Sequence, residues 1–248
     1  MKKYILVLFV MIAMLFNGCG ATEIATPISM IMIAPSPTIE PVTIIEETLP
    51  MEIAPRSNVP FVSEYAMEDY LLPFEDYSRA RKYAPEFVMI HFCSAIVNHP
   101  DDPYNLQYVR DTFIQYNVSP HYIIERDGTI HCYIPENRVA WHAGKGAWQD
   151  NEKYKNNMNN YSIGIELVAI GSFADMSIFM SEETYEKIDK DLLGYTDAQY
   201  EALNALLKDL CNRHDIPFDR EHIIGHEEYS SRKTDPGELF DWSRALNN

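Results

Sequence analysis

Several features are scarce in this chain of 248 residues, and each shortage excludes a class of protein. Its four cysteines include no Cys-x-x-Cys pair, which excludes a fold held together by dense disulfide bonds. Lys and Arg number 20 against 37 Asp and Glu, and the formal charge is −17. Clustered cations for nucleic-acid phosphates or anionic lipid headgroups are therefore missing, and we expect no nucleic-acid partner. The hydrophobic share of 46% is ordinary for a globular protein with a sizeable core.

The first residues, 1–19, are typical of an export signal. Lys2 and Lys3 precede the apolar run Tyr4–Phe16, which is shorter than the ~20 residues that span a bilayer. The run leads to Cys19 in a sequence that resembles the lipobox of bacterial lipoproteins, although two neighbouring residues depart from that pattern. A plain secretory signal and an uncleaved anchor are the alternatives. All three predict an extracytoplasmic location, and the preferred interpretation is a lipid anchor at Cys19.

The next segment, residues 20–62, differs in composition from the rest of the chain. Prolines recur through it and hydrophobic periodicity is weak, which favours an extended chain over a packed one. We interpret this segment as an extracytoplasmic tether, and a strand docked on another surface is the weaker alternative. A folded domain is then expected over residues 63–248.

Apolar patterns in this domain predict strands alternating with helices. The predicted strands are residues 86–92, a hairpin over 121–134, and residues 162–168 and 222–226. The predicted helices are residues 105–116 and 196–214. Thr196 and Gln199 have the spacing of a capping box, which marks the start of the second helix. Strands separated by helices, with one hairpin, predict a mixed α/β fold with a central mixed β-sheet flanked by helices.

Two candidate metal ligands lie near the end of the chain. His226 follows a short apolar strand, and Asp235 precedes a Pro-Gly turn. An imidazole nitrogen and a carboxylate oxygen are both good zinc ligands. The helical H-E-x-x-H zinc motif is excluded because Ser230 occupies the position of its second histidine. A hydrogen-bonded His–Asp pair is the commoner explanation, so a metal site needs a third ligand from elsewhere.

That third ligand is predicted to be His91, at the end of the strand 86–92, although most histidines in apolar strands are core residues. Glu166 lies inside another apolar strand, where a carboxylate is costly unless it is paired or functional. Lys233 is placed to stabilise a developing oxyanion, or alternatively to form a salt bridge with Glu166. Cys93 either faces this site or is a buried thiol.

These residues and their surroundings resemble the type-2 N-acetylmuramoyl-L-alanine amidases, a zinc amidase family that also includes the peptidoglycan-recognition proteins. The resemblance extends from about Glu86 to Trp242. The matching blocks are MIH at 89–91, HYIIERDGTI at 121–130, AWHAG at 140–144, NYSIGIEL at 160–167, YTDAQY at 195–200 and GH…RKTDPG…FDW at 225–242.

The resemblance implies that residues 63–248 form a single zinc amidase domain with its site at the strand ends of the sheet. One zinc ion per chain is implied, with three protein ligands: His91, His226 and Asp235. By the same resemblance, Glu166 handles the water proton and Lys233 faces the tetrahedral intermediate. Trp141 and His142 lie in the block that lines the substrate groove. The 169–194 connection is longer than the family pattern, which leaves substrate preference open.

The expected activity is hydrolysis of the amide between the lactyl group of N-acetylmuramic acid and L-alanine of the stem peptide. Peptidoglycan or muropeptides are the expected partners, and a membrane is expected only through the N-terminal anchor. A peptidoglycan-binding module without catalytic activity is the main alternative. Zinc-dependent hydrolysis of an unrelated secreted amide is the other.

Overall fold

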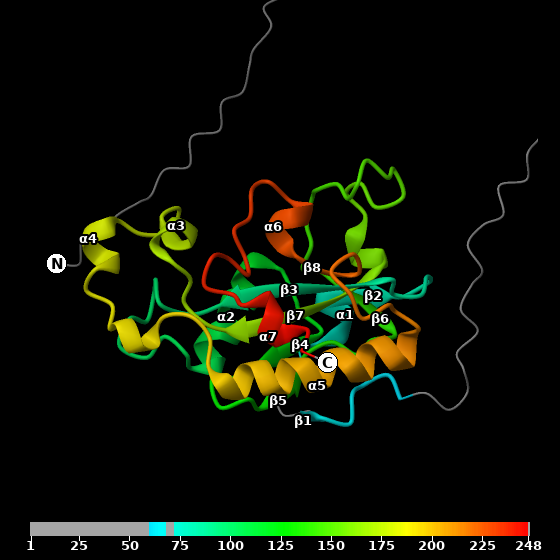
Figure 1. The fold of residues 1–248 in the computed structure, drawn as a ribbon, viewed down its shortest axis with the longest axis horizontal. Helices are drawn as coiled ribbons and strands as arrows, with labels where there is room; N and C mark the ends of the chain where they lie inside the picture. Colours follow the sequence, from blue (N-terminus) through cyan, green and yellow to red (C-terminus); the bar gives the residue numbers. More distant parts are fainter. Residues whose placement is uncertain (1–59, 68–71, 248) are drawn as a thin grey trace, which may run out of the picture. The chain divides into compact units, whose positions relative to one another are not determined.

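The computed structural model describes residues 60–67 and 72–247 of the chain (Figure 1). The predictions for the signal, for Cys19 and for most of the tether fall on residues 1–59, which lie outside the described part. A search of the described residues finds no helix with the length and apolar character needed to cross a membrane.

The centre of the domain is a six-stranded mixed sheet with the order β1-β5-β4-β7-β3-β8, which confirms the predicted fold class. Its strands are β1 Ala66–Met67, β3 Phe87–Cys93, β4 Tyr122–Ile124, β5 Ile130–Cys132, β7 Ser162–Val168 and β8 Ile223–Gly225. Four neighbouring strands, β4, β7, β3 and β8, are parallel, whereas β4 and β5 form the predicted antiparallel hairpin. A separate two-stranded sheet pairs β2 (Ser78–Ala80) with β6 (Arg138–Ala140).

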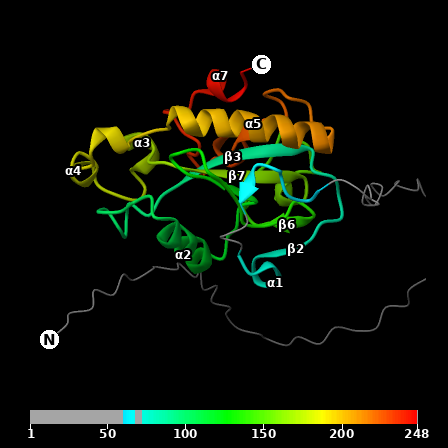
Figure 2. The same cartoon turned by 90° about the horizontal axis from the view of Figure 1, so that it is seen from below.

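Two long helices cover the two faces of the sheet. Figure 2 shows α5 (Asp197–His214) on one side of β3 and β7, and α2 (Leu106–Tyr116) on the other. The capping box at Thr196 is present as predicted, with its hydroxyl accepting a hydrogen bond from the Gln199 amide. The apolar side of α5 packs on the sheet in the largest core cluster, and α2 belongs to a second cluster on the opposite face.

Shorter elements complete the described part of the domain. The short helices are α1 Phe74–Tyr77, α3 Phe173–Met176, α4 Glu182–Tyr185, α6 His226–Tyr229 and α7 Trp242–Ala245, and the 3-10 turns are η1 Met158–Asn160 and η2 Lys190–Leu192. Residues 181–191 thus contain only the four-residue helix α4, followed by the start of η2. Figure 1 places α3 and α4 together at one end of the sheet.

Strand alternation decides which side chains reach the candidate site. Val88 and Ile90 of β3 enter the core under α5, so His91 points to the opposite face. The parallel register of β3 and β7 pairs His91 with Glu166. Because paired residues on adjacent strands point to the same face, the side chains of His91 and Glu166 lie next to each other on that face.

Candidate metal centre and active-site cleft

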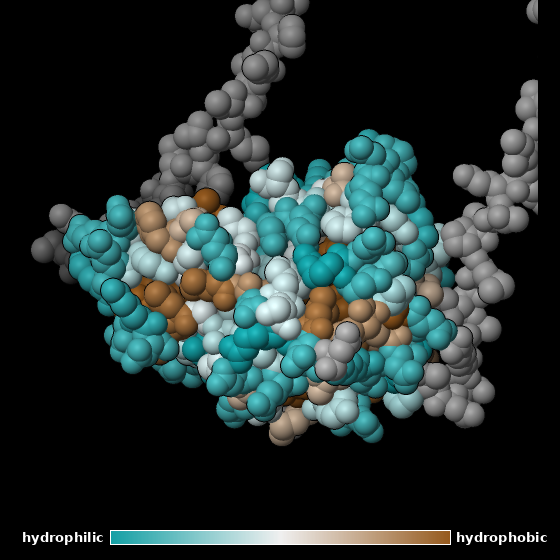
Figure 3. Space-filling model, viewed as in Figure 1, coloured by the Kyte–Doolittle hydropathy of each residue, from teal (hydrophilic) through white to brown (hydrophobic). Residues whose placement is uncertain are grey.

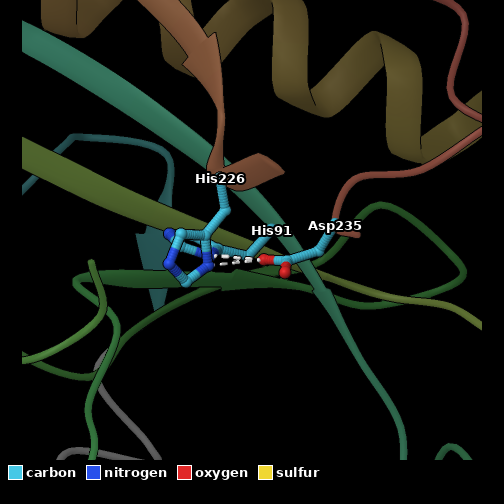
Figure 4. Close-up of side chains that lie close together, drawn as sticks. All are labelled: His91, His226 and Asp235. Atoms are coloured by element: carbon cyan, nitrogen blue, oxygen red, sulfur yellow. Dashed lines mark hydrogen bonds and ion pairs between the residues drawn. The ribbon is translucent and has the colours of Figure 1, made fainter. Parts of the chain in front are cut away.

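The three predicted metal ligands converge at the carboxyl ends of β3 and β8. Nδ1 of His91 lies 2.7 Å from Oδ2 of Asp235, and Nδ1 of His226 lies 2.9 Å from the same oxygen (Figure 4). One possible ligand atom from each residue falls within 4.8 Å of the other two. In the described part of the chain this is the one group of three or more His, Cys, Asp or Glu side chains with such geometry.

Each ligand is positioned by a different element. The strand β3 carries His91, and His226 begins α6 directly after β8. Asp235 lies in the following loop, where its carbonyl accepts a hydrogen bond of 3.0 Å from the Glu227 amide. The turn after it uses Gly237 with φ of +78°, a backbone conformation that side-chain-bearing residues rarely adopt.

The proton position on His226 follows from its second nitrogen. Nε2 lies 2.9 Å from the carbonyl oxygen of Ala143. A carbonyl can only accept, so Nε2 carries the proton and donates it. In a neutral His226, Nδ1 therefore presents a lone pair toward Asp235.

A longer chain of hydrogen bonds fixes the proton on His91. The Ser162 hydroxyl donates to the carbonyl of Met158 at 2.8 Å, so its oxygen is left to accept from Nε2 of His142 at 3.3 Å. Nδ1 of a neutral His142 then accepts, and the donor 3.0 Å away is Nε2 of His91. The Nδ1 atom of His91 consequently also presents a lone pair toward Asp235.

The Nδ1 lone pairs of His91 and His226 and the Oδ2 atom of Asp235 thus point toward one position. They repel one another unless a cation lies between them. Burial and the neighbouring His226 lower the pKa of His91 to about 4, so this imidazole is neutral at pH 7. Two imidazole nitrogens and one carboxylate oxygen are a donor set that fits zinc.

The candidate metal centre lies in a cleft of about 300 Å³. The cleft is also lined by Glu166, Lys233 and Trp141, so the structure brings the other predicted site residues together with the three ligands. Oε2 of Glu166 is buried and has no hydrogen-bond partner among the described residues. Burial and the nearby Asp235 raise the pKa of Glu166 to about 8, against opposing effects of Lys233 and a hydrogen bond from the Cys93 thiol.

Lys233 is exposed and makes no ion pair with Glu166 in the described structure, so the salt bridge considered as an alternative is not formed there. Cys93 is half-buried and faces Glu166, and burial raises the pKa of its thiol well above the usual value. It is not a member of the three-residue ligand group.

Trp141 and His142, the two residues expected in the substrate groove, both line the cleft but differ in their contacts. Trp141 is half-buried in the cleft wall. His142 also lines the cleft, but its ring nitrogens are hydrogen-bonded to His91 and Ser162. A Cβ added at Gly164 would lie 2.5 Å from this ring, so the glycine in β7 makes room for it. His142 therefore supports the candidate metal ligand His91 through its ring nitrogens.

Sequence reasoning did not single out Ser162 or the Ala143 carbonyl. The available signal for Ser162 was a serine and a glycine at alternate positions of an otherwise apolar strand, on the same face as Glu166. Such small residues in β7 mark a place where another side chain lies close to the backbone. A backbone carbonyl such as that of Ala143 leaves no signal in sequence.

The chain is similar to known amidases in sequence. Residues 81–238 match the family model described as N-acetylmuramoyl-L-alanine amidase. The 1,6-anhydro-N-acetylmuramyl-L-alanine amidase AmpD of Citrobacter freundii is 40% identical over 128 residues, which cover 51% of this chain and 54% of that protein. The N-acetylmuramoyl-L-alanine amidase AmiD of Escherichia coli strain K12 is 30% identical over 141 residues, covering 54% of this chain and 45% of AmiD.

A solved structure extends the comparison to three dimensions. The crystal structure of a selenomethionine derivative of AmpD superposes with a TM-score of 0.52 and 27% identity, and the match covers 75% of this chain and 95% of that one. The chain spans about half the length of the curated relatives it matches. Because the family model covers more than half of the chain, this protein belongs to the N-acetylmuramoyl-L-alanine amidase family.

Proposed function

We propose that this protein is a zinc-dependent amidase that hydrolyses the bond between the lactyl group of N-acetylmuramic acid and L-alanine of a stem peptide. The observation that carries the proposal is the convergence of two histidine lone pairs on the Asp235 carboxylate, beside Glu166, whose Oε2 has no hydrogen-bond partner among the described residues. The named relatives AmpD and AmiD are both amidases of muramyl-L-alanine linkages, and this shared linkage supports the substrate class.

The residues divide the reaction between them. His91, His226 and Asp235 would hold one zinc ion, which when bound supplies a Lewis acid that makes water acidic enough to attack an amide near neutral pH. Glu166 has a free oxygen in the cleft and a raised pKa, as suits a group that accepts the water proton and passes it to the departing amine. The Lys233 ammonium lines the same cleft and stabilises negative charge on the carbonyl oxygen.

The test is release of peptide from a defined muropeptide. The full-length protein is incubated with purified N-acetylmuramyl-pentapeptide, with and without a chelator, and zinc is then returned to the chelated sample. The proposal predicts new peptides with a free L-alanine amino terminus, loss of this product with chelator, and recovery with zinc. Binding without release would support a recognition module instead, and cleavage of other amides alone would support an unrelated zinc hydrolase.

The location of the enzyme is a second part of the proposal. We infer an extracytoplasmic protein held at the cell membrane through lipid on Cys19, on the strength of the export-signal pattern in residues 1–19. Substitution Cys19→Ala should shift the protein from the membrane fraction to the soluble extracytoplasmic fraction. A wild-type protein that carries no lipid on Cys19, as measured by mass spectrometry, would contradict the lipid anchor.

A further inference from the structure

The 169–194 connection forms a lobe beside the metal centre that contains α3 and α4. Figure 3 shows hydrophobic surface on this lobe and below it. Ile178 and Phe179, directly after α3, are 65% and 57% exposed, and both line the active-site cleft. Other large exposed apolar residues, such as Val97 and Tyr116, are not part of the cleft lining. A pair of adjacent exposed apolar side chains at a cleft is a feature that binding explains.

Hydrogen bonds of Asp175 fix the backbone that precedes Ile178 and Phe179. The buried carboxylate of Asp175 accepts hydrogen bonds from the amide and hydroxyl of Ser172 at 2.9 and 2.8 Å and from the Glu238 amide at 3.3 Å. Its carbonyl accepts a bond from the Thr234 hydroxyl at 3.3 Å. These bonds join α3 to the loop that carries Lys233, so the lobe and the site are held together.

Apolar residues of the lobe also show that the exposure of the pair is selective. Met176 is buried at 3% exposure and packs with Ile170 and Ile96 in a small core of its own. The Tyr185 hydroxyl donates to the Gly171 carbonyl at 2.9 Å and so joins the end of α4 to the start of the lobe. The lobe therefore has an interior, and Ile178 and Phe179 are left outside it on the cleft surface.

The rest of the cleft indicates which ligand the pair contacts. Further apolar lining comes from Phe113, Val118 and Trp141. Two cationic side chains, Arg232 and Lys233, lie in the same cleft of a protein whose net charge is −17. This combination fits an anionic ligand with methyl and methylene groups.

The peptide and the sugar of a muropeptide differ in the apolar and anionic groups that they offer. A stem peptide offers alanine methyls, methylene chains and free carboxylates, whereas the sugar offers hydroxyls that lose water against an isoleucine without gaining partners. We propose that Ile178 and Phe179 form an apolar subsite for the stem peptide beyond its first L-alanine. This inference rests on the proposed amidase activity and assigns part of its specificity to the 169–194 lobe.

The test compares two substrates that differ only in the length of the peptide. The full-length double variant Ile178→Ser/Phe179→Ser and the wild type are assayed on N-acetylmuramyl-L-alanine and on N-acetylmuramyl-pentapeptide. We expect the variant to raise KM about tenfold for the pentapeptide, with kcat nearly unchanged, because an apolar contact is worth roughly 10–200-fold in discrimination. For the short substrate, KM and kcat should match the wild type.

Matched controls separate the possible outcomes. Val97→Ser changes an exposed apolar residue outside the cleft lining and should leave both substrates unaffected. Bound zinc is measured in every variant and should be unchanged. An equal loss on both substrates, or no loss on either, would overturn the subsite. If the wild type cleaves neither substrate, the proposed activity itself fails, and this result is distinct from the other two.

Discussion

The Ala143 carbonyl and the Ser162 hydroxyl lie behind the candidate metal centre and determine which ring nitrogens of its histidines carry the protons. Ala143 accepts directly from His226, and Ser162 acts on His91 through His142. Partners of this kind orient metal-ligating histidines and raise their affinity for the metal. The proposed zinc site therefore depends on residues that never touch the ion.

Substitution Ser162→Ala tests this dependence at a single residue. Without the hydroxyl, His142 is free to adopt the other tautomer, and His91 loses a fixed acceptor for its Nε2 proton. We expect zinc affinity to fall by about tenfold, at the lower end of the range for such partners. Competition with a chromophoric chelator measures the affinity. Ser63→Ala, another buried serine, is the control, because Ser63 is bonded to Tyr65 instead of the site. An unchanged affinity in Ser162→Ala would contradict the proton assignment.

Glu166 is expected to act on the reaction without contributing to metal binding. In Glu166→Gln the side chain keeps its size but can no longer accept the water proton. The turnover number should fall by roughly 10²–10⁴, the usual contribution of a general base. Zinc content, measured by elemental analysis, should stay at one per chain. Activity equal to the wild type would remove Glu166 from the mechanism.

At the scale of elements, the lobe formed by residues 169–194 braces the loop of Asp235. The Asp175 carboxylate holds both Ser172 and the Glu238 amide, and it packs so closely on Gly237 that an added Cβ there would lie 2.4 Å from its oxygen. Asp175→Ala should loosen this loop and reduce zinc affinity by about tenfold, in the range found for outer partners of a metal site.

The control for Asp175 lies in the same lobe. The Ser181 hydroxyl caps α4 through the Thr184 amide and, in the described part of the chain, makes no hydrogen bond to the loop of Asp235, so Ser181→Ala should leave zinc affinity unchanged. Zinc affinity of the two variants is compared by the same chelator competition. Equal affinities would show that the lobe does not support the metal centre.

Elements with a strong local signal could be predicted from the sequence. The capping box and apolar periodicity of α5, the hairpin of β4 and β5, and the apolar run of β7 all formed where expected. The 169–194 lobe could not be predicted, because it is stabilised by contacts between distant segments, such as Asp175 with Glu238. The same applies to the site: residue types identified His91 and Glu166 as candidates, but the relay through Ser162 depends on the strand register.

At the scale of the whole domain, a buried ionic cluster connects distant parts of the chain. The carboxylate of Glu136 is fully buried and is bonded to Arg213 at 2.5 and 2.7 Å, to His214 at 2.5 Å and to the Tyr122 hydroxyl. The Glu136 amide donates to the Phe61 carbonyl at 2.8 Å. The cluster thus joins α5, the hairpin and the first described residues.

This cluster predicts a specific loss of stability in acid. Burial alone would raise the pKa of Glu136, but the hydrogen bonds from His214 and Arg213 outweigh burial and lower it from 4.5 to about 2. A pKa lower in the folded state contributes stability above the unfolded value of 4.5, and this contribution is lost as pH falls toward 2. The contribution at pH 7 is about 3 kcal/mol.

Urea unfolding at pH 7 and pH 3 measures this effect. The free energy of unfolding should fall between the two pH values, and the fall should be smaller by about 2 kcal/mol in Glu136→Gln, since this variant is already destabilised at pH 7. An identical pH dependence in the two proteins would show that Glu136 is not responsible. Glu152→Gln is the control, because Glu152 is 80% exposed.

The central claim is that His91, His226 and Asp235 hold one zinc ion, and native mass spectrometry of the full-length protein tests it most directly. Zinc is added to the wild type and to Asp235→Ala at equal concentration, and the bound metal is counted. The account predicts one zinc per wild-type chain and none retained by the variant. Retention of one zinc by Asp235→Ala, or no zinc on the wild type, would contradict it.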